Sequence, residues 1–380
     1  MQRAKKEISR LSWASAPRVM AVAVFAVTLF GAGLLRFGAQ PAAAPIAGPA
    51  AAVPARHAVA AAPAAQPDGC AKPNRTIQLY AVELAKDPVT KQVRLGYGLA
   101  AKSASYPGPT IEMTEGECLA ITLHNNVSSA TLQSLRGNSA HPLAVSLHAH
   151  GVKYTASSDG TMENKSYVAP GGQRTYFWYA KPRDPTTGAQ GTAGYWWYHD
   201  HMVGGPHGTA GMSSGLFGAL IVRRQGDVKP ARTYVTAFGD RQSINLRRGA
   251  ATDTCAATKP VAGPTCLIAK PGERIEFVVI GIGNDVHTFH LHGHSWADTR
   301  TGTLDGTDKS LVNSVAVIDN KTLGPGDSFG LQIIAGDSVG PGNWMLHCHM
   351  QFHSDQGMST MLHVLNADGT VAPHSADHAP

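Results

Sequence analysis

The chain has 380 residues, including 41 glycines and 24 prolines, and its formal net charge at pH 7 is +6. Its first 18 residues hold five basic side chains and one acidic side chain, so they supply +4 of that charge and leave +2 for the rest. A nearly neutral body excludes a basic surface for nucleic acid, and the glycine and proline content favours strands and turns over long helices.

Residues 1–40 are predicted to be a signal peptide or a membrane anchor. An uncharged apolar run from Val19 to Leu35 follows the basic residues, and its 17 residues fit either alternative. Cleavage after Ala44 would satisfy the Ala-x-Ala rule but would leave Pro45 next to the cut bond. Either alternative places the rest of the chain outside the cytoplasm: in the periplasm, secreted, or anchored to the outer side of the cytoplasmic membrane.

Residues 41–70 are predicted to be a linker, because 20 of the 27 residues at 41–67 are Ala or Pro. Beyond the linker, apolar residues alternate over several short runs that end at Gly, Asn or Pro, which is typical of strands. These runs predict an all-β fold with two β-sandwich domains, at 71–226 and 227–368, and a tail at 369–380.

Histidine is distributed unevenly along the two predicted domains. The 18 histidines would give about one His-x-His pair by chance, whereas the sequence has five. Side chains two positions apart on a strand point to the same face, so each pair directs two imidazoles to one point. Four of the pairs could together surround three copper ions. Their members are His148, His150, His199, His201, His290, His292, His347 and His349.

Cys348 lies between the two histidines of the last pair and must therefore point to the opposite face of the strand. We predict a second copper site there, with Cys348, His287 and His353 as strong ligands and Met358 as a long axial ligand. Two histidines, a cysteine and a weak methionine are the ligand set of a blue, electron-transferring copper. The backbone on either side of Cys348 would join this copper to the histidine cluster.

The motifs recur, which indicates that the chain contains two copies of one unit. The run Trp-Tyr-His-Asp-His-Met in the first half matches Met-Leu-His-Cys-His-Met in the second. Asp200 thus occupies the position of Cys348, and Val145 occupies the position of His287. The first domain is therefore predicted to hold no blue copper and to contribute four imidazoles to a cluster that both domains share.

With these motifs, residues 75 to 366 resemble the multicopper oxidases, in particular the two-domain bacterial small laccases. The runs Tyr-Trp-Trp-Tyr-His-Asp-His at 195–201 and Ser-Asp-Gly at 158–160 favour this branch. The resemblance implies two cupredoxin-like Greek-key β-sandwiches that bind one type 1, one type 2 and two type 3 copper ions. By the resemblance, type 2 copper would bind His148 and His290; the type 3 pair would bind His150, His199, His201, His292, His347 and His349; type 1 copper would bind His287, Cys348, His353 and Met358.

The resemblance also implies an activity. A laccase couples four one-electron oxidations of phenolic or aromatic amine donors to the reduction of dioxygen to water. We expect donors to be oxidised at the type 1 site through an exposed edge of His287 or His353, with transfer along Cys348. By the same resemblance, Tyr154 would donate an electron and Asp159 would relay protons during oxygen reduction.

The family's two-domain members are homotrimers in which domain 1 of one chain meets domain 2 of the next, in a ring that closes. The sequence leaves open whether the cluster lies within one chain or between chains. Three rival functions also stay open. They are a copper nitrite reductase, which lacks the eight-histidine set and carries its blue site in the first domain, a cuprous-ion oxidase in copper tolerance, and a copper-binding protein without turnover.

The other histidines and cysteines are interpreted as structural. Five histidines in or near the domains fit no ligand position and are expected to be hydrogen bonded, and three more lie in the linker or tail. Cys255 and Cys266 bracket a Pro/Gly loop and are predicted to pair, which leaves Cys70 with Cys118 by elimination; free buried thiols are the alternative. The five histidines are His124, His141, His207, His294 and His363, and the three are His57, His374 and His378.

Overall fold

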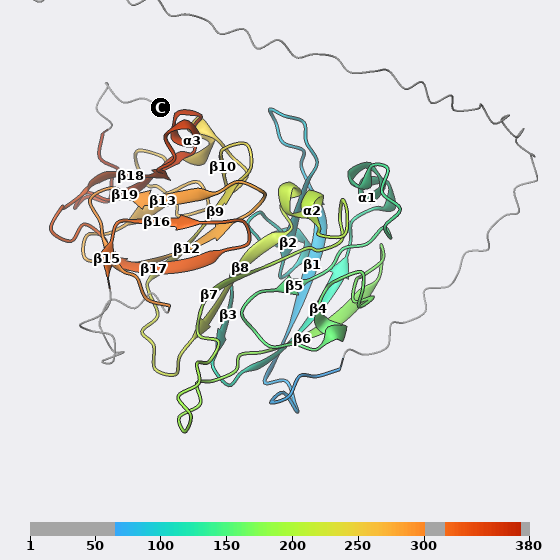
Figure 1. Ribbon diagram of the computed structural model, residues 1–380. Coiled ribbons are helices and arrows are strands. Elements are labelled where there is room, and N and C mark those ends of the chain that lie inside the picture. The colour runs from blue at the N-terminus through green and yellow to red at the C-terminus, as the bar shows by residue number, and fades with distance from the viewer. Residues whose placement is uncertain (1–64, 301–315, 374–380) are drawn as a thin grey trace, which may run out of the picture. The chain divides into compact units, whose positions relative to one another are not determined.

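Two β-sandwiches make up the part of the chain that the computed structural model describes, residues 65–300 and 316–373 (Figure 1). The predicted signal or anchor segment, residues 41–64 of the linker and residues 374–380 of the tail lie outside these ranges. No helix among the described residues is long and apolar enough to cross a membrane. The all-β prediction is confirmed, because only short helices interrupt the strands. The helices are α1 (Ser129–Arg136), α2 (Thr209–Ser214), α3 (Gln351–Asp355) and the 3-10 turns η1 (Ala101–Ser103), η2 (Ala156–Ser158) and η3 (Gly249–Thr252).

The first sandwich is built from two four-stranded sheets. Along β4 the apolar side chains alternate inward, as the sequence pattern predicts, and pack against Trp178 and Tyr97 in the core. In order across the sheets, the strands are β2 (Arg94–Gly98), β1 (Arg75–Leu84), β4 (Cys118–Asn125) and β6 (Gln173–Tyr179), and then β3 (Ile111–Thr114), β8 (Phe217–Arg223), β7 (Gly194–His199) and β5 (His148–Ala149).

The second sandwich has a four-stranded sheet, a five-stranded sheet and a two-stranded ribbon. Phe277 and Phe289 lie in its core. The strands, in sheet order, are β10 (Ser243–Ile244), β9 (Arg232–Gly239), β12 (Arg274–Gly281) and β17 (Ser328–Ile334); β11 (Leu267–Ala269), β19 (Ser359–Val364), β18 (Gly342–Cys348), β13 (His287–Leu291) and β16 (Asn320–Leu323); and β14 (Trp296–Ala297) with β15 (Val317–Ile318).

The pairing of strands repeats between the sandwiches, as the internal repeat of the sequence predicts. The first two long strands pair in parallel in each copy, β1 with β4 and β9 with β12. The histidine strands pair antiparallel in the same register, with His148 opposite His199 and His290 opposite His347. Because equivalent histidines face each other in both copies, each sandwich carries one equivalent set of imidazoles.

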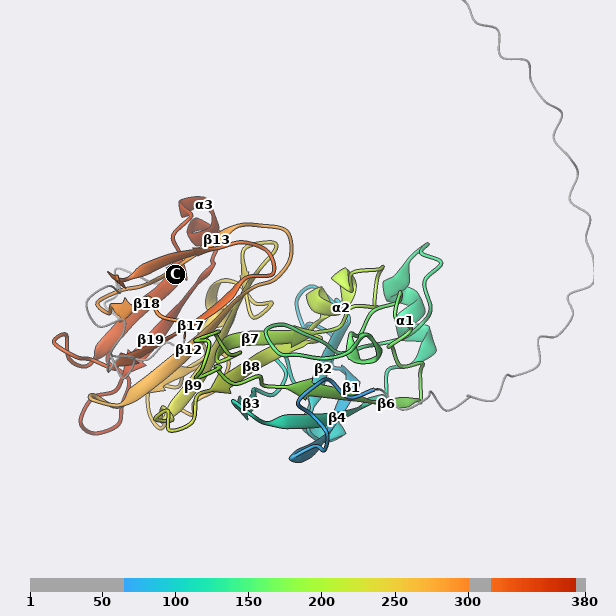
Figure 2. The same ribbon diagram turned by 60° about the horizontal axis from the view of Figure 1, so that its bottom comes forward.

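A third apolar cluster joins the two sandwiches. Strands β7 and β8 contribute Trp197, Phe217 and Ile221, which pack with Val278 and Ile280 of β12. Figures 1 and 2 show β7 and β8 beside β9 and β12. Every residue of β8 is buried, because one face of the strand covers its own core and the other covers the second sandwich. Full burial of a side chain such as Phe217 contributes roughly 1.5–3 kcal/mol.

Polar groups also hold the sandwiches together. The carboxylate of Glu276 on β12 is completely buried and accepts hydrogen bonds from Tyr195 and Arg223 of the first sandwich.

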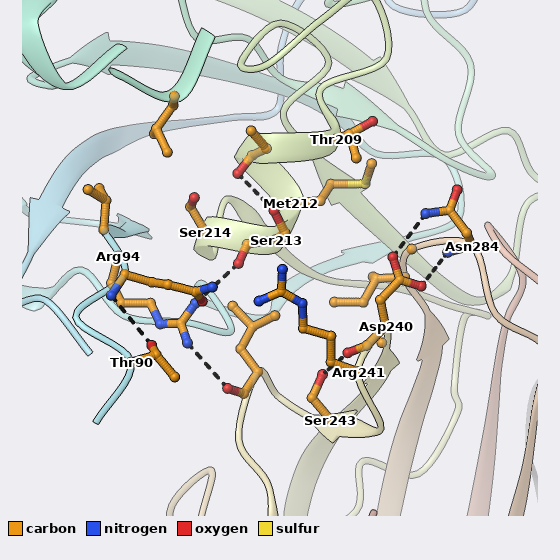
Figure 3. Close-up of a pocket in the computed structure, with 18 of the residues that line it drawn as sticks. Thr90, Arg94, Thr209, Met212, Ser213, Ser214, Asp240, Arg241, Ser243 and Asn284 are labelled. Carbon is orange, nitrogen blue, oxygen red and sulfur yellow. Dashed lines mark hydrogen bonds between the residues drawn. The ribbon is translucent and has the colours of Figure 1, made fainter. Parts of the chain in front are cut away.

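A cavity of about 440 Å³ lies between the sandwiches. It is lined by β2 and α2 of the first sandwich and by the ends of β9 and β12 of the second (Figure 3). The two sandwiches are therefore in direct contact and share one internal space.

The cysteine pairing follows the prediction. Cys70 is bonded to Cys118, and Cys255 is bonded to Cys266. Cys348 is the free cysteine among the described residues, and it is buried. The alternative of free thiols at the other four positions is wrong, and the remaining thiol is the predicted copper ligand.

Candidate metal centres

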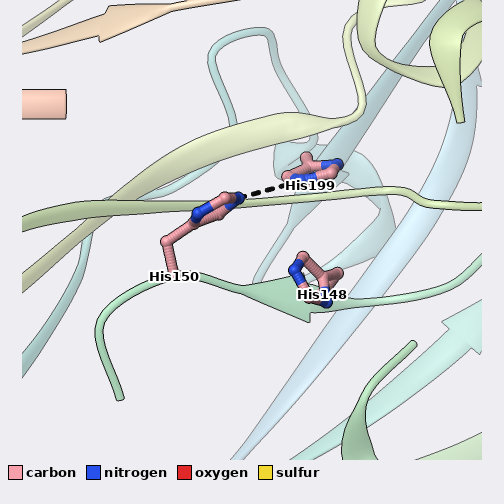
Figure 4. A group of neighbouring side chains, drawn as sticks. All are labelled: His148, His150 and His199. Atoms are coloured by element: carbon pink, nitrogen blue, oxygen red, sulfur yellow. Dashed lines mark hydrogen bonds between the residues drawn. The ribbon is translucent and has the colours of Figure 1, made fainter. Parts of the chain in front are cut away.

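The first sandwich holds one set of four histidines at the ends of β5 and β7. The Nε2 atoms of His150 and His199 face each other at 3.2 Å (Figure 4). The ring of His148 lies 5.2 Å from those of His150 and His201 and 5.3 Å from that of His199, measured between centroids. The i, i+2 spacing thus brings these rings to one point, as predicted.

The second sandwich repeats this arrangement on β13 and β18. Here the Nε2 atoms of His292 and His347 face each other at 3.2 Å. The ring of His290 lies 5.0 to 5.4 Å from the rings of His292, His347 and His349. Two of these four imidazoles, those of His292 and His349, are solvent-exposed.

The two sets do not meet within one chain. Among residues 65–300 and 316–373, the four histidines on β5 and β7 make all their ring contacts and hydrogen bonds within the first sandwich. The four histidines on β13 and β18 make all of theirs within the second sandwich. The structure therefore has two half-sites, each with four imidazoles and an open side.

Backbone carbonyls fix which nitrogen of four rings carries the proton. The Nδ1–H groups of His148 and His290 donate to the carbonyls of Asp159 and Asp319 at 2.6 and 2.7 Å. Those of His199 and His347 donate to the carbonyl of the next residue, at 2.8 and 3.0 Å. In each ring Nε2 then carries the lone pair and points into the half-site, which is the arrangement of a metal-binding histidine.

Burial lowers the pKa of several half-site rings and so favours their neutral form. Burial, with the neighbouring imidazoles of His148 and His201, lowers the pKa of His150 to about 4. Burial also lowers the pKa of His199 well below its usual value, and lowers those of His201 and His347. The Nδ1 of His201 is buried and has no hydrogen-bond partner among the described residues. Neutral, unpartnered nitrogen donors fit a bound copper ion.

Cys348 lies on the opposite face of β18 from its neighbours, as the strand period requires. Its Sγ is 3.6 Å from Nδ1 of His353 and 3.9 Å from Nδ1 of His287. The backbone N–H of Thr288 donates to the same sulfur at 3.4 Å, and Met358 is buried in the adjoining core. Burial raises the pKa of the Cys348 thiol, so a bound cation is needed to hold it as thiolate at neutral pH.

The two proposed type 1 histidines differ in their exposure to solvent. His287 is 0% exposed and His353 is 8% exposed. The ring of Phe238 packs against His287 at 5.7 Å, and helix α3 begins at Gln351 and carries His353 inward. For His287 the prediction of an edge facing solvent is wrong, because its ring is completely buried. For His353, which keeps 8% of its surface exposed, it stays a prediction. The pKa of His287, which burial and His353 lower to about 4, reflects the same enclosure.

The first sandwich has a carboxylate where the second has its thiol. The buried Asp200 accepts backbone N–H bonds from Ser146, Met202 and Val203 at 2.7, 3.0 and 2.7 Å. Gly211 leaves room for this carboxylate, since a Cβ there would lie 2.3 Å from Oδ2. Burial raises the pKa of Asp200 to about 7, against the opposing effect of the N–H donors. Three backbone N–H groups therefore surround the carboxylate that occupies the position of Cys348 in the repeat.

Tyr154 and Asp159 both lie beside His148. The Tyr154 ring is 5.9 Å from the His148 ring, and Oδ1 of Asp159 is 3.4 Å from Nδ1 of His148. Thr161 and Asn164 each donate to Oδ2 of Asp159 at 2.7 Å. Burial, together with the Asp159 carboxylate, raises the pKa of Tyr154 to about 12. Both side chains are thus held against a half-site histidine.

Four of the five other histidines make the structural contacts expected of them. His124, His141, His294 and His363 contact Gln78, Met162, the backbone of residue 292 and Asn343, respectively. His207 differs, because its exposed ring lies 5.4 Å from that of His201 at the rim of the half-site. Sequence reasoning also missed Trp197, which stacks on His150 and His199 at 4.7 and 4.3 Å. Its place two residues before His199 on one strand face was the available signal.

Comparison with known proteins decides the family. Two family models, both described as multicopper oxidase, match residues 99–227 and 229–368. The chain belongs to the multicopper oxidase family. Its two sandwiches with cupredoxin-like pairing fit a two-domain, small laccase-like architecture.

Individual relatives of this multicopper oxidase have different printed functions. It is 32% identical over 275 residues to a probable nitrite reductase-hydroxylamine oxidoreductase fusion protein of Kuenenia stuttgartiensis, covering 69% of this chain and 28% of the relative. It is 29% identical over 151 residues to Laccase-6 of Arabidopsis thaliana, covering 37% and 25%. The chain thus spans about a quarter of the length of these relatives. A solved multicopper oxidase shares the fold, with a TM-score of 0.52 at 20% identity over 76% of this chain and 88% of that one.

Proposed function

We propose that the protein is a laccase, which oxidises phenolic or aromatic amine donors in four one-electron steps and reduces dioxygen to water. The observation that carries the proposal is the position of Cys348. Its thiol faces His287 and His353, while its chain neighbours His347 and His349 face the half-site on the other side of β18. A cysteine that links two copper centres has a purpose in electron transfer and none in simple copper storage.

The ligand assignment follows from the two kinds of centre. When bound, type 1 copper accepts single electrons, and the type 2 and type 3 coppers deliver four electrons to dioxygen. His148 and His290, the two rings held by aspartate carbonyls, are proposed for type 2 copper. The type 1 ligands are proposed to be His287, Cys348, His353 and Met358, and the type 3 ligands His150, His199, His201, His292, His347 and His349.

Two half-sites on one chain support a homotrimer with the cluster between subunits. Each half-site supplies four imidazoles, and the second leaves His292 and His349 exposed to solvent. A half-site completes its cluster when the first sandwich of one chain meets the second sandwich of the next. Such a heterologous contact closes into a ring when repeated with the right rotation.

The roles of Tyr154 and Asp159 follow from their contacts with His148. The Asp159 carboxylate, oriented by Thr161 and Asn164, lies where it can accept a proton and pass it toward the half-site. Tyr154 stays protonated at neutral pH and can give up an electron and a proton together, with Asp159 taking the proton. The charge of Asp159 is therefore what prepares Tyr154 for that role.

An extracytoplasmic location is part of the proposal. The described part of the chain contains two disulfides, and disulfides persist in oxidising compartments. The basic and apolar N-terminal segment would direct the chain there as a signal peptide or an anchor.

Oxygen uptake by the copper-loaded protein tests the proposed function. The donors are 2,6-dimethoxyphenol and cuprous ion in separate runs, with a peroxide assay alongside. A laccase consumes one dioxygen per four phenol molecules and releases no peroxide. Uptake on cuprous ion alone would assign the protein to copper tolerance instead, and no uptake on either donor would leave a copper-binding protein. Nitrite reduction under argon, measured with the same protein, would favour the nitrite reductase alternative.

A further inference from the structure

The cavity between the sandwiches has an unusual charge. Three arginines line it, Arg94, Arg241 and Arg248, against one carboxylate, that of Asp240. The Asp240 carboxylate is already occupied, because it accepts the backbone N–H groups of Asn284 and Asp285 and the side-chain amide of Asn284. Because Asp240 is bonded to these groups, its carboxylate does not neutralise the three arginines. The lining therefore has a net positive charge.

The three guanidinium groups differ in what they bind. Arg94 is buried and pairs with Asp87 at 3.0 Å, and its Nε has no hydrogen-bond partner among the described residues. Arg241 and Arg248 are exposed, and within the described chain neither side chain makes a hydrogen bond or ion pair. In Figure 3 the guanidinium of Arg241 points across the cavity toward helix α2, between Arg94 and Asp240. Two basic groups are therefore free to bind an anion.

Part of the lining is apolar, and two lining segments are close in the chain to the proposed type 1 ligands or to residues that contact them. Side chains of Val93, Leu135, Met212 and Ile282 supply an apolar surface. Residues 282–284, which line the cavity, belong to the loop that leads into β13, whose first residue is His287. On the neighbouring strand, Gly239 and Asp240 line the cavity directly after Phe238, whose ring packs on His287. The cavity wall thus includes the residues that directly follow Phe238 and a segment that ends three residues before His287.

We propose that this cavity binds aromatic carboxylates, and that Arg241 and Arg248 hold the carboxylate of a phenolic acid while its ring is oxidised. About 440 Å³ falls within the 300–1,000 Å³ range of small-molecule sites and accommodates one substituted ring. This inference rests on the proposed function. Each step would remove one electron and one proton from the phenol and leave a phenoxyl radical. The copper that His287, Cys348 and His353 would hold would accept the electron, and solvent would take the proton. Dioxygen is the final oxidant, and four such steps reduce it to two waters.

Binding is tested apart from turnover. The ligand is 3,4,5-trimethoxybenzoate, which has no phenol to oxidise, and its methyl ester is the neutral match. Calorimetry with the copper-loaded full chain is expected to show binding of the acid at least tenfold tighter than that of the ester. Arg241→Gln and Arg248→Gln should each weaken it by about tenfold, as the loss of a charge-assisted bond predicts. The control variant, Arg183→Gln, removes an exposed arginine outside the cavity and should leave the affinity for the acid unchanged.

Turnover then tests the donor role. Syringate is 2,6-dimethoxyphenol with an added carboxylate, so the two donors differ in the group that the arginines recognise. Both cavity variants should raise KM for syringate by about tenfold and leave kcat and KM for 2,6-dimethoxyphenol unchanged. Equal affinity for acid and ester, or an equal effect of Arg183→Gln, would overturn the site. A KM change shared by both donors would overturn the donor role. Intact acid binding without oxidation of any donor would mean that the laccase proposal has failed while anion recognition stands.

Discussion

Replacing Glu276 with Gln tests what holds the two sandwiches in register. Glu276 is 0% exposed and accepts hydrogen bonds from the hydroxyls of Tyr195 and Thr233, both at 2.6 Å. Arg223 donates two further bonds at 2.6 and 3.2 Å. The substitution keeps the shape of the side chain but removes its charge. Arg223 would then remain largely buried, with Glu112 at 3.5 Å as its one carboxylate partner within residues 65–300 and 316–373.

The size of the effect follows from the charge left behind. Breaking a buried ion pair by removing one partner costs about 3–5 kcal/mol, because the other charge stays desolvated. Since Glu112 compensates part of it, we expect Glu276→Gln to lower the free energy of unfolding by about 3 kcal/mol. The matched control is Arg75→Gln, which breaks the surface pair with Glu117 and should cost no more than about 1 kcal/mol.

Urea unfolding followed by tryptophan fluorescence measures both variants. The Glu276→Gln midpoint should fall with little change in slope, which reports a change in stability. A second change, Arg223→Met, made on top of Glu276→Gln should recover part of the loss, because it removes the unpaired charge. Two results would refute the reasoning that the unpaired charge of Arg223 causes the loss of stability. One is a decrease in the free energy of unfolding of less than about 1 kcal/mol in Glu276→Gln, and the other is no recovery of stability in the double variant.

Three further predictions concern the metal centres and Asp200. Cys348→Ser should abolish the blue thiolate-to-copper absorption of the loaded protein while the histidine cluster still binds copper, as measured by absorption and metal analysis. Met358→Leu should raise the type 1 potential in a redox titration, because the weak axial ligand is lost; an unchanged or lower potential would contradict the assignment. The pKa of Asp200 is raised from 3.8 to about 7 in the fold, so its contribution to the stability of the copper-free protein is present below pH 4. That contribution should be lost between pH 4 and 7, by up to about 4 kcal/mol, and Asp200→Asn should flatten this part of the pH profile.

The strand period made much of the metal site predictable. Because side chains two apart share a face, the sequence alone places each His-x-His pair together and turns Cys348 away from its neighbours. The internal repeat likewise predicts that Asp200 replaces the copper-binding thiol. Both relations depend on local geometry, which a strand repeats whatever surrounds it.

Features that depend on packing between distant segments were not predictable in this way. The burial of His287 depends on Phe238, which lies on another strand. In the alternating run of β12, Glu276 occupies a position that would face solvent in an isolated sandwich, and it is buried because the first sandwich covers it. The cavity arginines come from segments more than 140 residues apart in the chain, Arg94 and Arg241, so no motif marks them.

Mixing two inactive variants tests most directly whether the oxygen-reducing cluster is built between chains. His199→Ala disables the first half-site and His347→Ala disables the second. Each variant alone should consume no dioxygen with 2,6-dimethoxyphenol. If both are co-expressed with different tags and purified through both, an intact first half-site of one chain can meet an intact second half-site of the next. Each mixed trimer that carries both tags then has one active contact out of three. Recovery of oxygen uptake to about that fraction of wild type is the predicted result, whereas a mixed assembly as inactive as its parents would contradict the shared cluster.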